Sequence, residues 1–155
     1  MRRIDELLAE YGQSHQHPVN KLIHWVCVAL IVWSLLSVLW SFPVPSLLQT
    51  SMLTLNLAVI IVALAMVYYL SVSPRLALGM LLALTGLLLL VHAVAQTGAS
   101  VWIVSVAVFI PAWIGQFIGH AIEGRRPSFF KDVQFLLIGP LWLLAFIYKK
   151  LNIQY

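Results

Sequence analysis

Four of the five histidines in this sequence fall into two groups that are far apart along the chain. His15, His17 and His24 stand near the N-terminus, and His120 stands in the last third. Imidazole and oxygen ligands without thiolates suit iron, zinc or manganese. Histidines with a carboxylate and open metal positions are the arrangement of non-haem Fe(II) oxygenases. The residue types therefore predict a metal site and leave the metal open among these three.

Helical spacing gives both groups polar neighbours. Gln116, His120 and Glu123 are separated by four and then three residues, so they share one face of a helix. Asn20 and His24 are likewise four residues apart. Imidazole and carboxylate groups at the edge of hydrocarbon are costly unless they are paired or metal-bound. We therefore expect a functional cluster here, with solvation at the membrane surface as the alternative.

The histidines differ in which neighbouring groups their side chains can contact. His15 and His24 would face opposite sides of one continuous helix, because nine residues turn it through about 900°. Pro18 interrupts that helix and frees His15 to fold back. His17 stands beside Pro18, and both a ligand role and a structural role stay open for it. We expect His92 near the opposite membrane face, where it forms a hydrogen bond between helices.

Composition places these residues in a membrane protein. The chain is 62% hydrophobic and only 9% charged, which is typical of the membrane class. Within residues 22–122 the only Asp, Glu, Lys or Arg is Arg75. Segments of about 20 apolar residues cross the hydrocarbon as helices. The expected transmembrane helices are residues 22–40, 52–70, 76–95 and 101–119.

The ends of the chain complete the expected fold, which is an all-α polytopic membrane helical bundle. Residues 3–11 carry apolar side chains at helical spacing and predict a short interfacial helix. Residues 133–148 are apolar but are interrupted by Gly139 and Pro140, which predicts a re-entrant or interfacial helix pair. We expect one membrane domain over residues 1–155, made of an N-terminal interfacial segment (1–21), four transmembrane helices (22–119) and a cytoplasmic-face loop with C-terminal helices (120–155).

Basic residues set the orientation. Arg75 lies in the second loop, and Arg125 and Arg126 follow the fourth span, whereas the first and third loops have no Lys or Arg. By the positive-inside rule, the N-terminus and the histidine groups face the cytoplasm. Because the basic residues lie toward the two ends of an apolar chain, they indicate anionic lipid as a partner and not nucleic acid. Two explanations of Arg125 and Arg126 stay open. They either only keep this end of the helix on the cytoplasmic side, or one of them also holds a substrate carboxylate in a bidentate contact.

The sequence also resembles a family, the 2-hydroxy fatty acid dioxygenases related to a yeast enzyme of phytosphingosine metabolism, formerly a domain of unknown function. Two blocks carry the resemblance, which spans nearly the whole chain. The first is residues 15–24 (HQHPVNKLIH), and the second is residues 113–120 (WIGQFIGH), continued by residues 123–130 (EGRRPSFF) and 139–142 (GPLW). The compact chain is similar to the bacterial branch, which implies a bacterial inner membrane.

The resemblance implies an Fe(II)-dependent membrane enzyme. Such an enzyme uses O₂ to oxidise a 2-hydroxy fatty acid to the acid one carbon shorter, a fatty acid alpha-oxidation. The implied iron ligands and catalytic residues are His15, His24 and His120. The implied orienting groups or additional ligands are His17, Asn20, Gln116 and Glu123.

Two rival functions remain open. The first is a non-catalytic, histidine-rich membrane module for metal or proton transport or for sensing. The expected second and third spans offer few polar side chains for such a path, mainly Asn56, Thr85 and His92, so an enzyme at one membrane face is favoured. The second rival is a purely structural membrane protein. An oligomer stays possible under every one of these functions.

Overall fold

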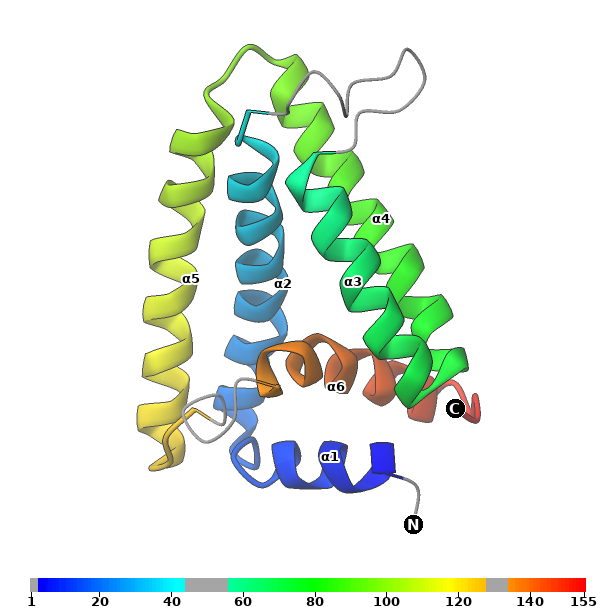
Figure 1. Ribbon diagram of the computed structural model, residues 1–155. Helices are drawn as coiled ribbons and strands as arrows, with labels where there is room; N and C mark the ends of the chain where they lie inside the picture. The colour runs from blue at the N-terminus through cyan, green and yellow to red at the C-terminus, as the bar shows by residue number, and fades with distance from the viewer. Residues whose placement is uncertain (1–2, 44–55, 128–133) are drawn as a thin grey trace.

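The chain folds into helices and connecting loops in a computed structural model that describes residues 3–43, 56–127 and 134–155 (Figure 1). Within these ranges every regular element is helical, as the all-α prediction required. The helices are α1 (Arg3–Gly12), α2 (Pro18–Trp40), α3 (Leu57–Val72), α4 (Pro74–Gln96), α5 (Val101–Glu123) and α6 (Phe135–Lys150).

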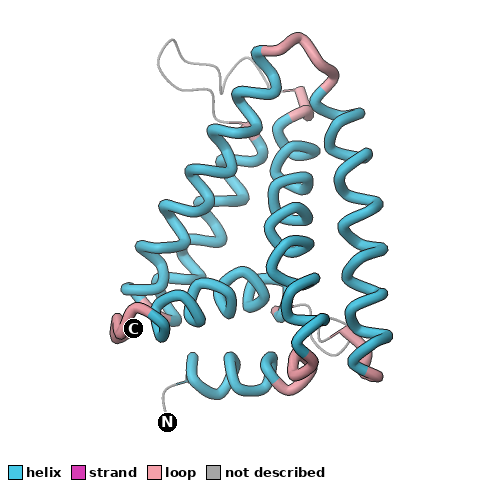
Figure 2. Tube along the Cα trace, turned by 180° about the vertical axis from the view of Figure 1, so that it is seen from behind, coloured by secondary structure: helices cyan, strands magenta, loops and turns pink. Residues whose placement is uncertain are grey.

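Helices α2 to α5 form the body of the molecule, and α1 and α6 close one end of it (Figure 1). α2 packs along α5, and α3 packs along α4. α1 and α6 lie across the end of the bundle where both termini are found, in both views (Figures 1 and 2). The N-terminal end of α2 and the C-terminal end of α5 meet at this same end. The topology therefore brings the two histidine groups together.

Small residues set the close approach of α5 to α2. A Cβ added at Gly115 would lie 2.6 Å from Sγ of Cys27, and one added at Gly119 would overlap Oδ1 of Asn20. Contacts that short do not occur between a real Cβ and its neighbours. The stripe of small residues on α5 thus works as a helix-packing motif.

Three helices of the described chain, α2, α4 and α5, are long and apolar enough to cross a membrane. Each has 23 residues, or about 35 Å of helix against a hydrocarbon core of ~30 Å. α3 has 16 residues and is shorter than that core. Residues 52–55, the start of the second predicted span, lie outside the described residues. The structure thus supports three of the four predicted spans directly.

The C-terminal segment differs from the prediction. Instead of a helix pair broken at Gly139 and Pro140, α6 is one helix that includes both residues. A proline removes one backbone hydrogen bond and usually kinks a helix, but packing on neighbouring elements can hold it in place. Here a Cβ at Gly139 would meet the Tyr11 hydroxyl at 2.8 Å, so α6 packs tightly on α1 at this point. The predicted break was therefore wrong, while the predicted α1 is confirmed.

Local signals set the start of α2 and the end of α5 at the site. Pro18 is the first residue of α2, a position that proline favours, and His17 caps the helix because its Nδ1 accepts a hydrogen bond from the backbone N–H of Val19. Gly124 ends α5 with φ 69°, a left-handed conformation that glycine adopts without strain. The chain between α1 and α2 can therefore turn back over the end of α5.

Candidate metal centre

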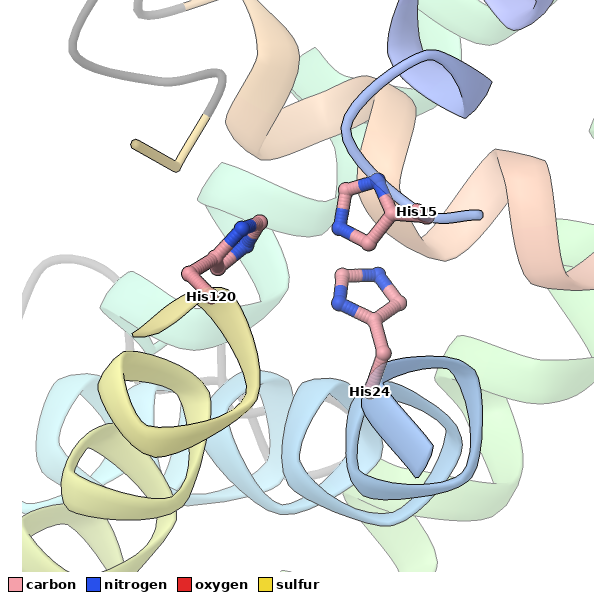
Figure 3. Close-up of side chains that lie close together, drawn as sticks. All are labelled: His15, His24 and His120. Atoms are coloured by element: carbon pink, nitrogen blue, oxygen red, sulfur yellow. The ribbon is translucent and has the colours of Figure 1, made fainter. Parts of the chain in front are cut away.

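Three imidazoles converge at the shared end of the bundle (Figure 3). His15 comes from the segment between α1 and α2, His24 from α2 and His120 from α5. One ring nitrogen from each residue lies within 4.8 Å of the other two. The ring centroids of His15 and His24 are 4.2 Å apart, and those of His15 and His120 are 4.8 Å apart. All three side chains are buried, with exposed fractions of at most 5%.

Hydrogen bonds fix the ring of His24. Its Nδ1 lies 3.1 Å from Oε1 of Gln116, an atom that can only accept, so Nδ1–H is the donor. Nε2 of the neutral ring then carries a lone pair, to which the Tyr11 hydroxyl donates at 3.0 Å. Burial raises the pKa of Tyr11, which keeps that hydroxyl protonated. Gln116 therefore sets the tautomer that leaves Nε2 basic.

A backbone carbonyl fixes His15 in the same way. Its Nδ1–H donates to the carbonyl oxygen of Tyr11 at 2.9 Å, and its ring stacks on the Tyr11 ring at 4.5 Å with an interplanar angle of 18°. The Trp142 ring lies 5.5 Å away and helps to cover the imidazole. Burial lowers the pKa of His15, so the ring is neutral at physiological pH. Its Nε2 has a free lone pair.

Glu123 ties the His15 segment to the end of α5. Its Oε1 accepts a hydrogen bond from the backbone N–H of Gln16 at 2.8 Å, and its Oε2 accepts from the backbone N–H of His17, also at 2.8 Å. The side-chain amide of Asn20 donates to Oε2 at 3.1 Å and to the carbonyl of Ser14 at the same distance. The carboxylate therefore holds the segment that carries His15 against the end of α5. We call Glu123 and its three N–H donors the Glu123 clasp.

The donor set fits a metal ion. Among the buried polar atoms of the described residues, Nε2 of His15 and Nδ1 of His120 have no hydrogen-bond partner. Buried polar atoms are rarely left unpaired, so two such nitrogens on neighbouring rings call for an explanation. Nitrogens that share a metal at ~2.1 Å lie at most about 4 Å apart. Small side-chain rotations would bring the three imidazoles onto one ion.

Cavities reach the cluster from several sides. A mostly apolar cavity of about 60 Å³ is bounded by Tyr11, His24, Gln116 and His120, with apolar side chains of α2 and α6. A wider pocket of about 600 Å³ begins at His120 and runs past residues 124–127. Another, of about 340 Å³, leads to His15 between α1 and α6. The cluster is thus buried but not sealed.

Cationic side chains stand at two of these openings. Arg125 and Arg126 are exposed and line the pocket beside His120, where the sequence placed a possible carboxylate partner. Lys21 and Lys149 line the pocket beside His15. The second pair was not predicted, because Lys149 comes from α6 and is far from His15 in the sequence.

The structure separates the predicted site residues into those near the cluster and those outside it. Asn20, Gln116 and Glu123 contact the histidines or the segment that carries His15. His17 is exposed, and its Nδ1 is used in capping α2. His92 lies on α4, next to Gln96 of its own helix at 3.5 Å and the Trp40 ring at 6.0 Å. The hydrogen bond expected between helices is thus within one helix.

Sequence reasoning missed Tyr11 and Trp142. Tyr11 was read only as part of the apolar face of α1, yet its ring, hydroxyl and carbonyl all contact the histidines. A signal was present, because Tyr11 precedes His15 by four residues, about one helical turn. Trp142 stands in the block of residues 139–142 that carries the resemblance, but no spacing links it to the histidines, since only the fold brings α6 over the site.

Comparison with known proteins gives two matches. A family model described as "2-hydroxy-palmitic acid dioxygenase Mpo1-like" matches residues 1–151. The 2-hydroxy-palmitic acid dioxygenase MPO1 of Saccharomyces cerevisiae is 33% identical over 146 residues, which cover 92% of this chain and 78% of the yeast protein. No solved structure matches the chain.

Proposed function

This chain belongs to the Mpo1-like family, and on that premise we propose that it is an Fe(II)-dependent dioxygenase of 2-hydroxy fatty acids. The reaction would convert a 2-hydroxy acid to the fatty acid one carbon shorter. The observation that carries the proposal is the buried cluster of His15, His24 and His120, whose nitrogens lie within 4.8 Å of one another. The alternative function, a histidine-rich module for transport or sensing, would not require the apolar cavity that lies beside the cluster.

Iron is favoured over zinc by the chemistry. Three imidazoles alone are also a zinc donor set, but Zn²⁺ has no redox chemistry. Bound Fe(II) supplies the electron transfer that a reaction with O₂ requires. His15, His24 and His120 would hold it, with Gln116 and the carbonyl of Tyr11 orienting two of the rings. Glu123 is proposed as a positioning residue, because its oxygens accept three N–H donors.

Other residues would bind and shield the substrate. The hydroxyl-bearing carbon would lie in the apolar cavity beside His24 and His120. Arg125 or Arg126, at the opening beside His120, would hold the carboxylate. Tyr11 and Trp142 cover the histidines and would exclude water from the reacting atoms.

The proposed reaction balances without a further reductant. One 2-hydroxy acid and one O₂ give the shortened acid, CO₂ and water, and the substrate loses the four electrons that O₂ accepts. The chain would therefore need no reductase partner for turnover. Its partners would be the fatty acid, O₂ and membrane lipid.

Three long apolar helices indicate a membrane protein, and we propose the bacterial inner membrane with the N-terminus and active site on the cytoplasmic side. The support is the distribution of basic side chains. Lys21, Arg125, Arg126 and Lys149 all border the pockets at the end of the bundle where the termini lie. Such residues are retained on the cytoplasmic side.

The test is turnover by the purified protein in detergent. With Fe(II), O₂ and 2-hydroxypalmitic acid, we expect O₂ uptake and equal amounts of the acid one carbon shorter. Alanine at His15, His24 or His120 should abolish the product. His92→Ala is the matched control, because His92 is exposed and remote from the cluster. No product from the iron-loaded wild type, or full activity of the three variants, would contradict the proposal.

A further inference from the structure

The cavity at the histidines is too small for a whole fatty acid. Its volume of about 60 Å³ compares with roughly 300–1,000 Å³ for pockets that enclose small-molecule ligands. Only the reacting end of a 2-hydroxy fatty acid fits there. The acyl tail must leave the cavity and lie along another part of the protein.

An adjoining groove has the right size and chemistry. It lies between α2, α4 and α6, and its volume is about 470 Å³. Every side chain that lines it is apolar, apart from the indole nitrogen of Trp25. On α4 its lining runs from Met80 to Leu90, a distance of about 15 Å along the helix. Along α4 the lining is therefore long enough to lie beside an extended part of an acyl chain.

The groove and the histidine cavity are neighbours that share part of their lining. Val28 and Val32 on α2 and Pro140 on α6 line both of them. The polar atoms of the cluster stand at one side of this junction, and hydrocarbon side chains stand at the other. A molecule with one polar end and one apolar end would match this order. A phospholipid tail would also fit the groove, but its headgroup would then have no place at the buried junction.

We propose that the groove between α2, α4 and α6 binds the acyl tail of the substrate, and that Gly86, which has no side chain, leaves the room that a long tail needs. This inference rests on the proposed function. The tail would pass Val28, Val32 and Pro140 and continue along α4. Because the groove lies against a helix predicted to cross the membrane, the tail would enter from the lipid without crossing water.

Gly86 is the position where the groove can be filled without disturbing the fold. A Cβ built there meets no atom within 4 Å. Ala29 and Ala83 also line the groove, so small side chains on two helices keep it open. A phenylalanine at position 86 would occupy part of the volume and block the tail. Replacing glycine inside a helix does not lower helix propensity, so the variant should fold.

The test compares Gly86→Phe with Thr85→Phe, which adds an aromatic ring one residue away and outside the groove lining. The readout is kcat/KM for 2-hydroxypalmitic acid divided by kcat/KM for 2-hydroxydecanoic acid. For Gly86→Phe we expect this ratio to fall roughly tenfold or more, because each excluded methylene is worth about 10-fold or more in a filled apolar pocket. Thr85→Phe should keep the wild-type ratio. An unchanged ratio in an active Gly86→Phe variant overturns the inference.

A binding experiment separates this inference from the proposed reaction. Metal-free protein is photolabelled with 2-hydroxypalmitic acid that carries a diazirine near its methyl end, and the labelled peptides are identified by mass spectrometry. We expect labels on α4 and α6, removed by excess unlabelled 2-hydroxypalmitic acid and reduced in Gly86→Phe. Labels that persist with the competitor mean that the probe only partitions onto this apolar face, as any membrane lipid would, and overturn the inference. Competed labelling in a protein without turnover would support the groove while the proposed function fails.

Discussion

The Glu123 clasp makes the most specific prediction. Removing the carboxylate in Glu123→Ala takes the acceptors away from the backbone N–H groups of Gln16 and His17 and from the Asn20 amide. Each such hydrogen bond contributes about 1 kcal/mol or more net. Glu123 is partly exposed, so water will replace some of that contribution. We therefore expect a loss of about 1–3 kcal/mol in the ordering of the segment that carries His15.

This loss of ordering free energy should lower the affinity for Fe(II). If the His15 segment must be reordered for each binding event, 1–3 kcal/mol corresponds to roughly 5- to 150-fold weaker Fe(II) binding. Anaerobic titration against a competing chelator measures this change. Glu123→Gln keeps one oxygen acceptor and should fall between the wild type and Glu123→Ala. Glu6→Gln, on the exposed face of α1, is the control for a lost carboxylate.

Two results would refute this reasoning about Glu123. Unchanged affinity in Glu123→Ala would mean that the clasp does not order His15. Complete loss of metal in Glu123→Gln, equal to the loss in a histidine variant, would make the carboxylate a ligand instead of a positioning group.

Three further predictions concern the same end of the bundle. Gly119→Ala should push Asn20 away and lower the stability by about 1–3 kcal/mol, measured as a lower Tm in detergent; an unchanged Tm would contradict the tight contact of α5 with α2. Tyr11→Phe should lower the Tm of the metal-free protein, because Nε2 of His24 loses its donor, yet Fe(II) binding should persist; loss of binding would instead make the Tyr11 oxygen a ligand. Burial lowers the pKa of His15, so the unfolded chain takes up more protons and the Tm of the metal-free protein should fall as the pH drops below ~6.5; a His15→Ala variant with the same pH profile would contradict this.

Much of the architecture follows from the sequence, because apolar segments of sufficient length have few alternatives in a membrane. Those segments predicted α2, α4 and α5, and the amphipathic pattern predicted α1. The expectation that His120 would meet His15 and His24 followed from counting crossings and from the break at Pro18. None of these predictions required knowledge of how side chains pack.

The failures have a common physical cause, since each depends on contacts between distant segments. Pro140 signals a break only when nothing else holds the helix, but α6 lies against α1 and α4. Tyr11 looked like an apolar anchor, because its role depends on where His24 lies. For Glu123 the sequence left a ligand role and an orienting role open, because it does not show which N–H groups the two carboxylate oxygens accept.

The central claim is that His15, His24 and His120 bind iron, and metal content tests it most directly. The protein should be purified anaerobically in detergent, loaded with Fe(II), desalted and analysed by mass spectrometry beside alanine variants of the three histidines and the His92→Ala control. Stoichiometric iron in the wild type and in His92→Ala, lost in the three variants, is the predicted result. A wild type without iron, or variants that retain it, would contradict the account.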